Sequence, residues 1–315
     1  MSFVYSTGLA SFLLLVYGIF RVLKTGRGDV MFFHEFTALY DQHPVYFAIY
    51  CAMSVFIATH YYSCFSRVSK LGVIAINLLL GVVLLLTSSK AILLVFAVLY
   101  PIQLALYIKN AKMRLISIFA LLTLGILSVI NIPFLQERFV EGLTLNYTSF
   151  QPTHDVGEAF VFGNDDKHNL SDLDLRYIFW RLALFHLNDD GKLLLGYGVG
   201  DVQDHLDLYY MYYGLAPGWF EGYNVHNQYL QILASMGILG LLLFCFYLWK
   251  SVTVANRNKS FLHLAFLGTM LFAFCFESYL SRNKGIVLFV FFNTLLIKDY
   301  YLNEIRDHRN QGDTK

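Results

Sequence analysis

The sequence alternates long apolar runs with short polar breaks, and one long polar stretch interrupts this pattern after residue 131. A helix needs about 20 mainly apolar residues to cross the hydrocarbon core of a bilayer. The pattern predicts an all-α polytopic membrane protein with about eight transmembrane helices and one large loop. The first run is too long for a signal-peptide core and lacks a basic start, so we interpret it as a span. The predicted spans lie near residues 3–22, 44–65, 71–87, 91–108, 115–131, 227–249, 261–280 and 285–297.

The polar stretch, residues 132–226, is predicted to be a partly helical loop. Ser171-Asp172-Leu173-Asp174 resembles a capping box with Asp in place of Glu, and it opens a predicted helix over 172–187. A second short helix is predicted from Asp201 to about Tyr213, while the polar segment 145–170 is expected to be poorly ordered. Apolar residues of the first helix form one stripe: Leu175, Ile178, Phe179, Leu182 and Phe185.

Composition supports a membrane environment. The chain is 57% hydrophobic and 14% charged, whereas soluble domains carry roughly 25% charged residues. The net charge of +1 indicates no nucleic-acid partner, and the four cysteines form no CxxC pair that would suggest a metal or redox site.

Basic residues predict the orientation of the spans. Three short loops on one predicted side carry eight of them, and the positive-inside rule places this side in the cytoplasm. Both termini are then cytoplasmic. The predicted organisation is a bundle of five spans over 1–131, an extracytoplasmic loop over 132–226, three spans over 227–297 and a cytoplasmic tail over 298–315. The basic loop residues are Arg67, Lys70, Lys109, Lys112, Arg114, Lys250, Arg257 and Lys259.

A His-Asn pair, His226-Asn227, stands where the loop enters the sixth apolar run. Imidazole titrates near neutral pH, so His226 is a candidate general base that takes a proton from a sugar hydroxyl. The alternative is a histidine that only anchors the helix at the membrane surface. Asn227 either orients a substrate or caps the helix.

Arg176 lies in the first turn of the predicted loop helix, with Trp180 four residues on. A cation near a helix N-terminus is unfavourable to the helix dipole, which suggests an anionic ligand. The loop is acidic, with 14 acidic and 5 basic residues between 132 and 226, so Arg176 stands out there. The alternative is a surface pair with Asp172 or Asp174.

Two further cationic positions lie at the predicted outer edge of the membrane. Lys90 follows two serines in a tight turn between two apolar runs, where ionisable residues are costly and are functional candidates. Arg282 and Lys284 follow Glu277 and break the positive-inside bias, which suits a phosphate-bearing lipid. The alternatives are snorkelling of Lys90 to the headgroups and a Glu277–Arg282 pair that only joins two helices.

Two other motifs are less specific. The glycines of the 196–201 segment do not have dinucleotide-binding spacing, and no strand precedes them. We interpret the segment as a turn that allows close approach to the membrane or a substrate. The Tyr-rich cluster 209–213 stacks on sugar rings or forms an interfacial aromatic belt.

These residues resemble the bacterial O-antigen ligase and O-antigen polymerase superfamily of polytopic membrane glycosyltransferases. The most specific piece is the segment 226–230 with Gly237 and Gly240, which is similar to the family's His-Asn-x-Tyr-Leu and Gly-x-x-Gly pattern. Arg176 and Trp180 followed by the 196–200 turn are similar to a second family segment. Ser89-Lys90-Ala91 is similar to a Ser-Arg-x-Ala turn, and His43-Pro44 also fits. The resemblance covers roughly residues 40–297.

The resemblance implies a site that receives a glycan linked to undecaprenol through pyrophosphate, at the outer face of the bacterial inner membrane. The family's histidine activates the acceptor hydroxyl, which places His226 as the base; the acceptor is a lipid A core or another glycan. Pyrophosphate binding falls to Arg176 and Lys90, supported by Arg282, Asn227 and Trp180. The reaction inverts the anomeric centre and uses no nucleotide sugar, cofactor or essential metal.

The chain departs from the family in two ways. Lys90 stands where the family prefers Arg, and lysine keeps the charge but loses the bidentate fork. The chain has eight predicted spans where the family usually has ten to twelve, so it is either a shortened member or incomplete at its N-terminus. The motifs do not separate a ligase from a polymerase that joins lipid-linked repeat units. They also leave open a lipid-linked sugar transporter and a non-catalytic assembly protein.

Overall fold

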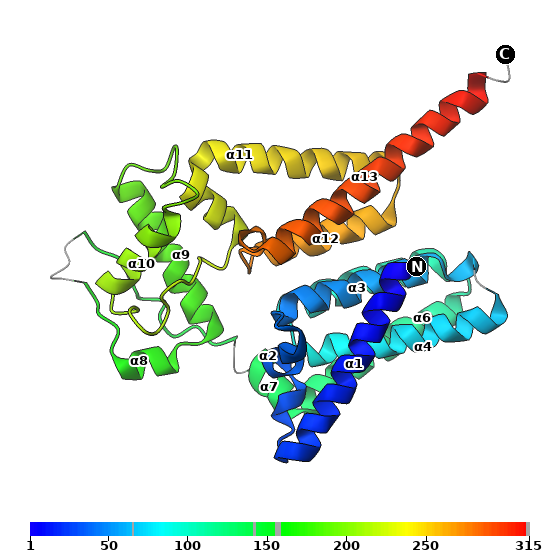
Figure 1. Cartoon of the computed structure of the whole chain (residues 1–315), viewed down its shortest axis with the longest axis horizontal. Helices are drawn as coiled ribbons and strands as arrows, with labels where there is room; N and C mark the ends of the chain where they lie inside the picture. Colours follow the sequence, from blue (N-terminus) through cyan, green and yellow to red (C-terminus); the bar gives the residue numbers. More distant parts are fainter. Residues whose placement is uncertain (65, 141–142, 155–158, 313–315) are drawn as a thin grey trace. The chain divides into compact units, whose positions relative to one another are not determined.

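The computed structural model describes residues 1–64, 66–140, 143–154 and 159–312, and these residues form thirteen α-helices and no β-strand. The all-α prediction is therefore confirmed for the described chain. The chain divides into two compact units (Figure 1). The first contains residues 1–139, 255–270 and 298–315, and the second contains residues 140–254 and 271–297.

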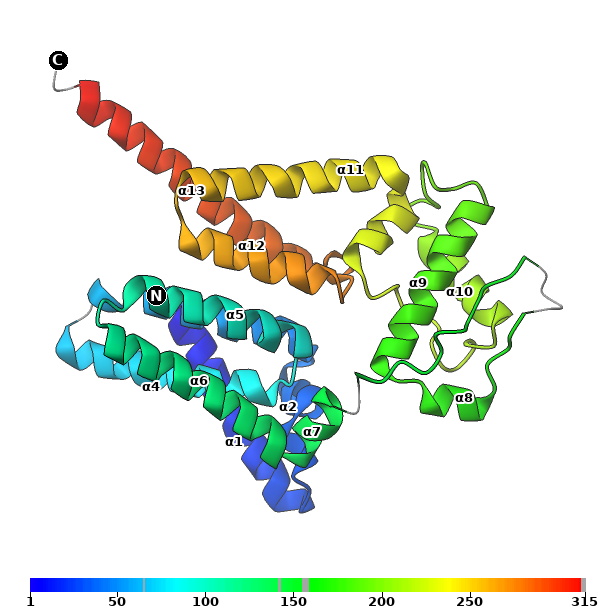
Figure 2. The same cartoon turned by 180° about the vertical axis from the view of Figure 1, so that it is seen from behind.

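The first unit is a helical bundle built around α3 (Pro44–His60), which packs against α1 (Ser2–Thr25), α4 (Arg67–Leu86) and α5 (Lys90–Tyr107). Figure 2 shows α1, α4 and α5 of this bundle from behind. Most of α3 is buried, because its own apolar residues occupy all faces of the helix rather than one stripe. The Gln103 side chain of α5 donates to the Phe56 carbonyl of α3 at 2.8 Å. The bundle also includes α6 (Ala111–Asn131) and the short helices α2 (Phe33–Thr37) and α7 (Pro133–Phe139).

Several helices are apolar enough to lie in a bilayer. Within the described part of the chain, four are also long enough to cross one: α1, α5, α6 and α11 (Gln228–Arg257). Shorter apolar helices cover Pro44–His60, Lys70–Leu86 and Phe261–Phe274, the last being α12. On α6, Phe119 is 73% exposed. Exposure of this apolar side chain is unfavourable in water but not in lipid. Their number and composition indicate a multi-pass membrane protein.

The part of the second unit that precedes α11 is a small helical domain with its own core. Its helices are α8 (Asn164–Asn169), α9 (Asp172–Asp189) and α10 (Val202–Tyr212). The Ser171–Asp174 capping box that opens α9 is present as predicted. Within the domain, Ile178, Phe179 and Leu182 of α9 are fully buried, and the Phe179 ring lies 4.6 Å from the Tyr210 ring of α10.

Two expectations about this domain are wrong. Phe150 and Phe162 are core residues, so the described parts of 145–170 are packed rather than poorly ordered; residues 155–158 lie outside the described residues. Three members of the Tyr-rich cluster, Tyr209, Tyr210 and Tyr213, are also buried in this core. These three rings fill the interior of the domain and are not available for sugar stacking or an interfacial belt, whereas Tyr212 of the same cluster is exposed.

The predicted sixth span is not one continuous helix. Gly237 has φ 66° and ψ −169°, which divides α11 into two helical parts that meet at a bend, visible in Figure 1. The bend leaves backbone groups of α11 without their helical partners. The glycine-rich turn supplies them, since the Tyr197 amide donates to the Ala234 carbonyl at 2.8 Å and the Ile238 amide to the Leu193 carbonyl at 3.0 Å. The close approach predicted for this turn is therefore to the α11 backbone.

Candidate functional site

The turn that leads into α11 holds His226 in a defined orientation. His226 has φ 48°, a left-handed conformation that is uncommon for a residue other than glycine, and its amide donates to the Asn224 side chain at 2.9 Å. The preceding residue, Val225, is fixed from two sides. Its carbonyl accepts from Trp180 Nε1 at 2.9 Å, and its amide donates to Gln231 Oε1 at 3.3 Å. Trp180 therefore positions the turn.

The His226 imidazole lies beside a carboxylate that the sequence analysis assigned elsewhere. His226 Nδ1 is 3.4 Å from Glu277 Oε2, and the two side chains are 24% and 11% exposed. The Phe179 ring lies nearly parallel to the imidazole, with the ring centres 6.3 Å apart. A carboxylate at Nδ1 favours the tautomer in which the other nitrogen, Nε2, can accept a proton. The pair thus has the geometry of an oriented general base.

Asn227 uses its side chain within the protein. Its Oδ1 accepts from the Leu230 amide at 3.0 Å, which caps the start of α11. Its Nδ2 donates to the Cys275 carbonyl at 3.1 Å, and its backbone amide donates to Ser278 Oγ at 3.2 Å. This geometry favours the capping role over direct contact with a substrate.

Arg176 reaches from α9 to the same segment. Its Nε donates to the Phe276 carbonyl at 3.2 Å, and its Nη1 donates to the Asp172 carbonyl at 2.9 Å. Both acceptors are neutral carbonyl groups, so they orient the guanidinium without cancelling its charge. The Asp174 carboxylate instead accepts from the amides of Asn146 and Tyr147, at 2.7 and 3.1 Å.

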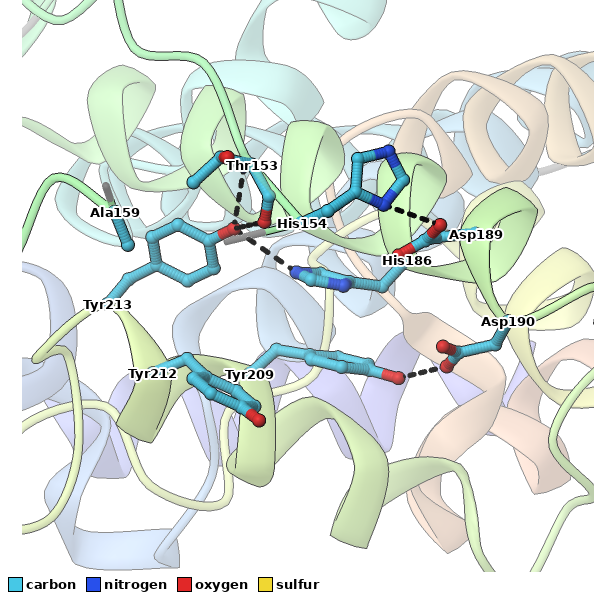
Figure 3. Close-up of a pocket in the computed structure, with 9 residues that line it drawn as sticks. All are labelled: Thr153, His154, Ala159, His186, Asp189, Asp190, Tyr209, Tyr212 and Tyr213. Carbon is cyan, nitrogen blue, oxygen red and sulfur yellow. Dashed lines mark hydrogen bonds and ion pairs between the residues drawn. The ribbon is translucent and has the colours of Figure 1, made fainter. Parts of the chain in front are cut away.

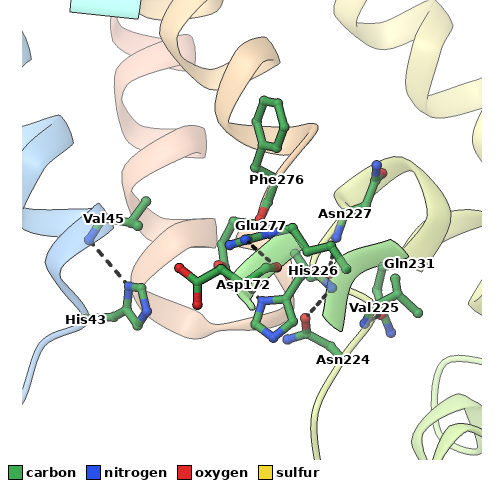
Figure 4. A network of polar contacts seen from close by, with 12 residues as sticks. His43, Val45, Asp172, Asn224, Val225, His226, Asn227, Gln231, Phe276 and Glu277 are labelled. Carbon is green, nitrogen blue, oxygen red and sulfur yellow. Dashed lines mark hydrogen bonds and ion pairs between the residues drawn. The ribbon is translucent and has the colours of Figure 1, made fainter. Parts of the chain in front are cut away.

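Residues 275–278, hereafter the 275–278 segment, join these contacts. Figure 4 shows two of them, Phe276 and Glu277, beside His226. Each of its four residues contacts a predicted site residue: Cys275 and Ser278 contact Asn227, Phe276 contacts Arg176, and Glu277 contacts His226. Sequence reasoning missed this segment as the organiser of the site. The signal in the sequence was Glu277, an acidic residue at the end of an apolar run.

The two remaining predicted residues, Arg282 and Lys90, belong to other elements of the chain. Arg282 is exposed directly before α13 (Asn283–Gly312), in the second unit. Lys90 belongs to the first unit, where it is the first residue of α5 and is half-buried. Beside its turn, Arg138 Nε donates to the Ser88 carbonyl at 3.0 Å, and the guanidinium lies 3.4 Å from the Phe33 ring centre. Sequence reasoning missed Arg138, although it is one of the few basic residues between 132 and 226.

Among the described residues, no three His, Cys, Asp or Glu side chains are grouped as a metal site would require. The groups that the site does offer are an imidazole beside a carboxylate and an oriented guanidinium. Together they can move a proton and stabilise developing negative charge.

Fold and site together define a multi-pass membrane protein with a polar site at the head of a broken apolar helix. A family model described as O-antigen ligase matches residues 75–245, more than half of the 315-residue chain, and the chain belongs to this family. The protein is thus an O-antigen ligase- or polymerase-type membrane glycosyltransferase, and the predicted resemblance is confirmed. No curated protein matches the chain. The matched range includes Lys90, Arg176 and His226 and ends before Glu277.

Proposed function

We propose that the protein transfers a glycan from undecaprenyl pyrophosphate to an acceptor hydroxyl, at the outer face of the bacterial inner membrane, as an O-antigen ligase does. The observation that carries this proposal is the contact of Glu277 with His226. Glu277 belongs to the 275–278 segment, which also orients Arg176. The acceptor is a lipid A core or another surface glycan.

His226 acts as the general base. Its Nε2 takes the proton of the acceptor hydroxyl while the hydroxyl oxygen attacks the anomeric carbon of the donor. The bond from that carbon to the pyrophosphate oxygen breaks, and attack from the opposite face inverts the anomeric centre. Glu277 holds the imidazole by its Nδ1 and stabilises the imidazolium that forms. Glu277 is therefore a positioning residue.

Arg176 stabilises the leaving group. Negative charge develops on the pyrophosphate as its bond to the sugar breaks, and a cation already held in place stabilises that charge without reorganisation. Arg282, in the same unit, is proposed as a supporting cation for the pyrophosphate, and pyrophosphate binding by Lys90 stays a prediction from the resemblance. A lysine at that position offers charge alone, because it lacks the planar fork of arginine. Trp180 and Asn227 keep the His226 turn in place.

The topology follows from the basic loops. Eight spans with cytoplasmic termini would place residues 132–226 outside the cytoplasm, where the lipid-linked glycan is accessible. A transporter of such lipids would use a broken helix to expose free backbone groups to its cargo. The break in α11 is filled by the 193–198 turn, which favours an enzyme.

Transfer by the purified full-length protein in lipid nanodiscs tests the proposal. The donor is undecaprenyl pyrophosphate that carries a labelled glycan, and the acceptor is a lipid A core. His226→Ala should lower the transfer rate about 10²-fold or more, whereas His168→Ala, which changes an exposed histidine of α8, should retain it. Full activity of His226→Ala would exclude the assignment. Products that grow on the lipid carrier, with no transfer to the core, would indicate a polymerase instead.

A further inference from the structure

The domain that precedes α11 contains a cavity of about 140 Å³ (Figure 3). This exceeds the ~10–15 Å³ that one water molecule requires. It lies between the ends of α9 and α10 and the segment near Thr153, and His226 and Arg176 do not line it. The residues that define its chemistry are Thr153, His154, His186, Asp189, Asp190 and Tyr212.

One wall of the cavity is a rigid network of rings. The His186 imidazole stacks on Tyr209 with the ring centres 3.9 Å apart and the planes 2° from parallel. Tyr213 Oη lies 3.3 Å from His186 Nε2 and accepts from the Thr153 amide at 3.1 Å. Burial lowers the pKa of His186 below its ordinary value, so this wall is uncharged at neutral pH.

A second wall presents carboxylates. Asp190 accepts hydrogen bonds from Tyr209 and, at 2.8 Å, from Tyr197. Burial alone would raise the pKa of Asp190, but the bonds from these two hydroxyls hold it below its ordinary value. At the rim, Asp189 pairs with His154 at 2.7 Å, and the His154 side chain is 71% exposed. The cavity therefore offers fixed hydrogen-bond acceptors near solvent.

The remaining rim residue is an accessible aromatic ring. Tyr212 is 41% exposed, whereas one face of Tyr209 is covered by His186 and most of its surface is buried. An exposed phenol ring can lie against the apolar face of a sugar, with its hydroxyl free to form hydrogen bonds.

The chemistry of the lining selects a class of ligand. Two carboxylates repel phosphate and other anions, and no lysine or arginine is among the described residues that line the cavity. Carboxylate acceptors suit neighbouring hydroxyl donors, and an aromatic ring suits the apolar face of a pyranose. A neutral sugar meets both requirements, in contrast to the cationic groups proposed to hold the pyrophosphate.

We propose that this cavity is a glycan-binding subsite that holds a sugar of the donor glycan away from the reacting end. The proposal rests on the proposed glycan transfer and extends it to the recognition of the transferred chain. Binding energy from a remote part of a substrate can be used to orient its reacting end. The subsite would therefore affect the KM for the lipid-linked donor.

Direct binding to the full-length protein in nanodiscs tests the subsite. The probe is the neutral oligosaccharide released by mild acid from the cell's own lipid-pyrophosphate pool, detected by saturation-transfer NMR and titrated to obtain Kd. Tyr212→Ala and Asp189→Asn should each weaken binding about tenfold, the effect of losing roughly 1.4 kcal/mol. The matched controls are Met211→Ala, an exposed neighbour on α10, and Asp204→Asn in its first turn; both should bind as the unmodified protein does.

Two further measurements separate this proposal from the proposed reaction. His226→Ala should keep the oligosaccharide Kd while it loses transfer; loss of neither would reject the reaction and leave the subsite supported. Undecaprenyl pyrophosphate without a glycan should not displace the oligosaccharide. Unchanged binding in both Tyr212→Ala and Asp189→Asn, or displacement by the bare lipid pyrophosphate, would overturn the subsite.

Discussion

Leu194 and Gly237 meet backbone to backbone at the bend of α11. A Cβ atom at position 237 would lie 2.1 Å from the Leu194 carbonyl oxygen, and one at Gly196 would lie 2.5 Å from the Ser235 carbonyl carbon. Glycine is therefore required on both sides of this contact. The turn after α9 and the break in α11 therefore pack against each other through their backbones. This contact fixes the angle between the part of α11 that follows His226 and the rest of the helix.

Gly196→Ala should destabilise the protein. The residue has φ +72° and no room for a Cβ, and a strained residue of this kind costs about 1–3 kcal/mol. The measurement is the apparent Tm of the purified protein in detergent. Gly200→Ala is the matched control, because nothing lies within 4 Å of a Cβ there. Equal Tm values for the two variants would show that the contact does not constrain the fold.

Glu277→Ala should lower kcat for transfer about tenfold or more, because a base that has lost its orienting partner is less effective. Glu277→Asp should recover part of the rate, because it keeps the carboxylate. A role in packing alone would not lead to this recovery. Glu221→Ala, an exposed acidic change in the same unit, provides the control. A kcat for Glu277→Ala equal to that of the control would remove Glu277 from the mechanism.

Arg176→Ala should lower transfer about 10²-fold, the usual scale for losing a group that stabilises charge in the transition state. The transfer rate of Arg176→Lys should fall between those of the unmodified protein and Arg176→Ala. Lysine keeps the charge but not the two directed bonds to the carbonyls of Phe276 and Asp172. Arg181→Ala, on the same helix, should have little effect. Comparable rates for Arg176→Ala and Arg181→Ala would contradict the proposed role.

Stability should decrease as the pH is lowered through the titration of His186. Burial is the main cause of its lowered pKa, with His154 acting in the same direction and Asp190 and Asp189 opposing it. Below about 6.5, the ordinary histidine pKa, the unfolded chain takes up the proton before the folded one does. The stability that neutral His186 contributes to the free energy of unfolding is thus fully present above this pH. It is lost as the pH falls toward the pKa of His186 in the folded protein.

His186→Phe should keep the ring stacking on Tyr209 and lose this part of the pH dependence. The measurement is the change in apparent Tm between pH 7.5 and 5.5 for both proteins, so that the titration of the other histidines cancels. An identical change in the two proteins would show that His186 does not titrate on unfolding.

The amino-acid sequence determined the local structure well. Apolar run length predicted where the helices lie, and the Ser171–Asp174 capping box predicted where α9 begins. These features depend on residues only three or four positions apart, which a reader of the sequence can inspect directly. The position of His226 at the head of an apolar helix is visible for the same reason.

Tertiary structure alone decided what those residues contact. Glu277 meets His226 across 51 positions, and Arg176 reaches the Phe276 carbonyl across 100. The buried tyrosines of α10 and the break at Gly237 likewise depend on elements distant in the chain. The periodicity of apolar residues predicts each helix but not its partners, because the packing of the whole second unit decides which residues meet.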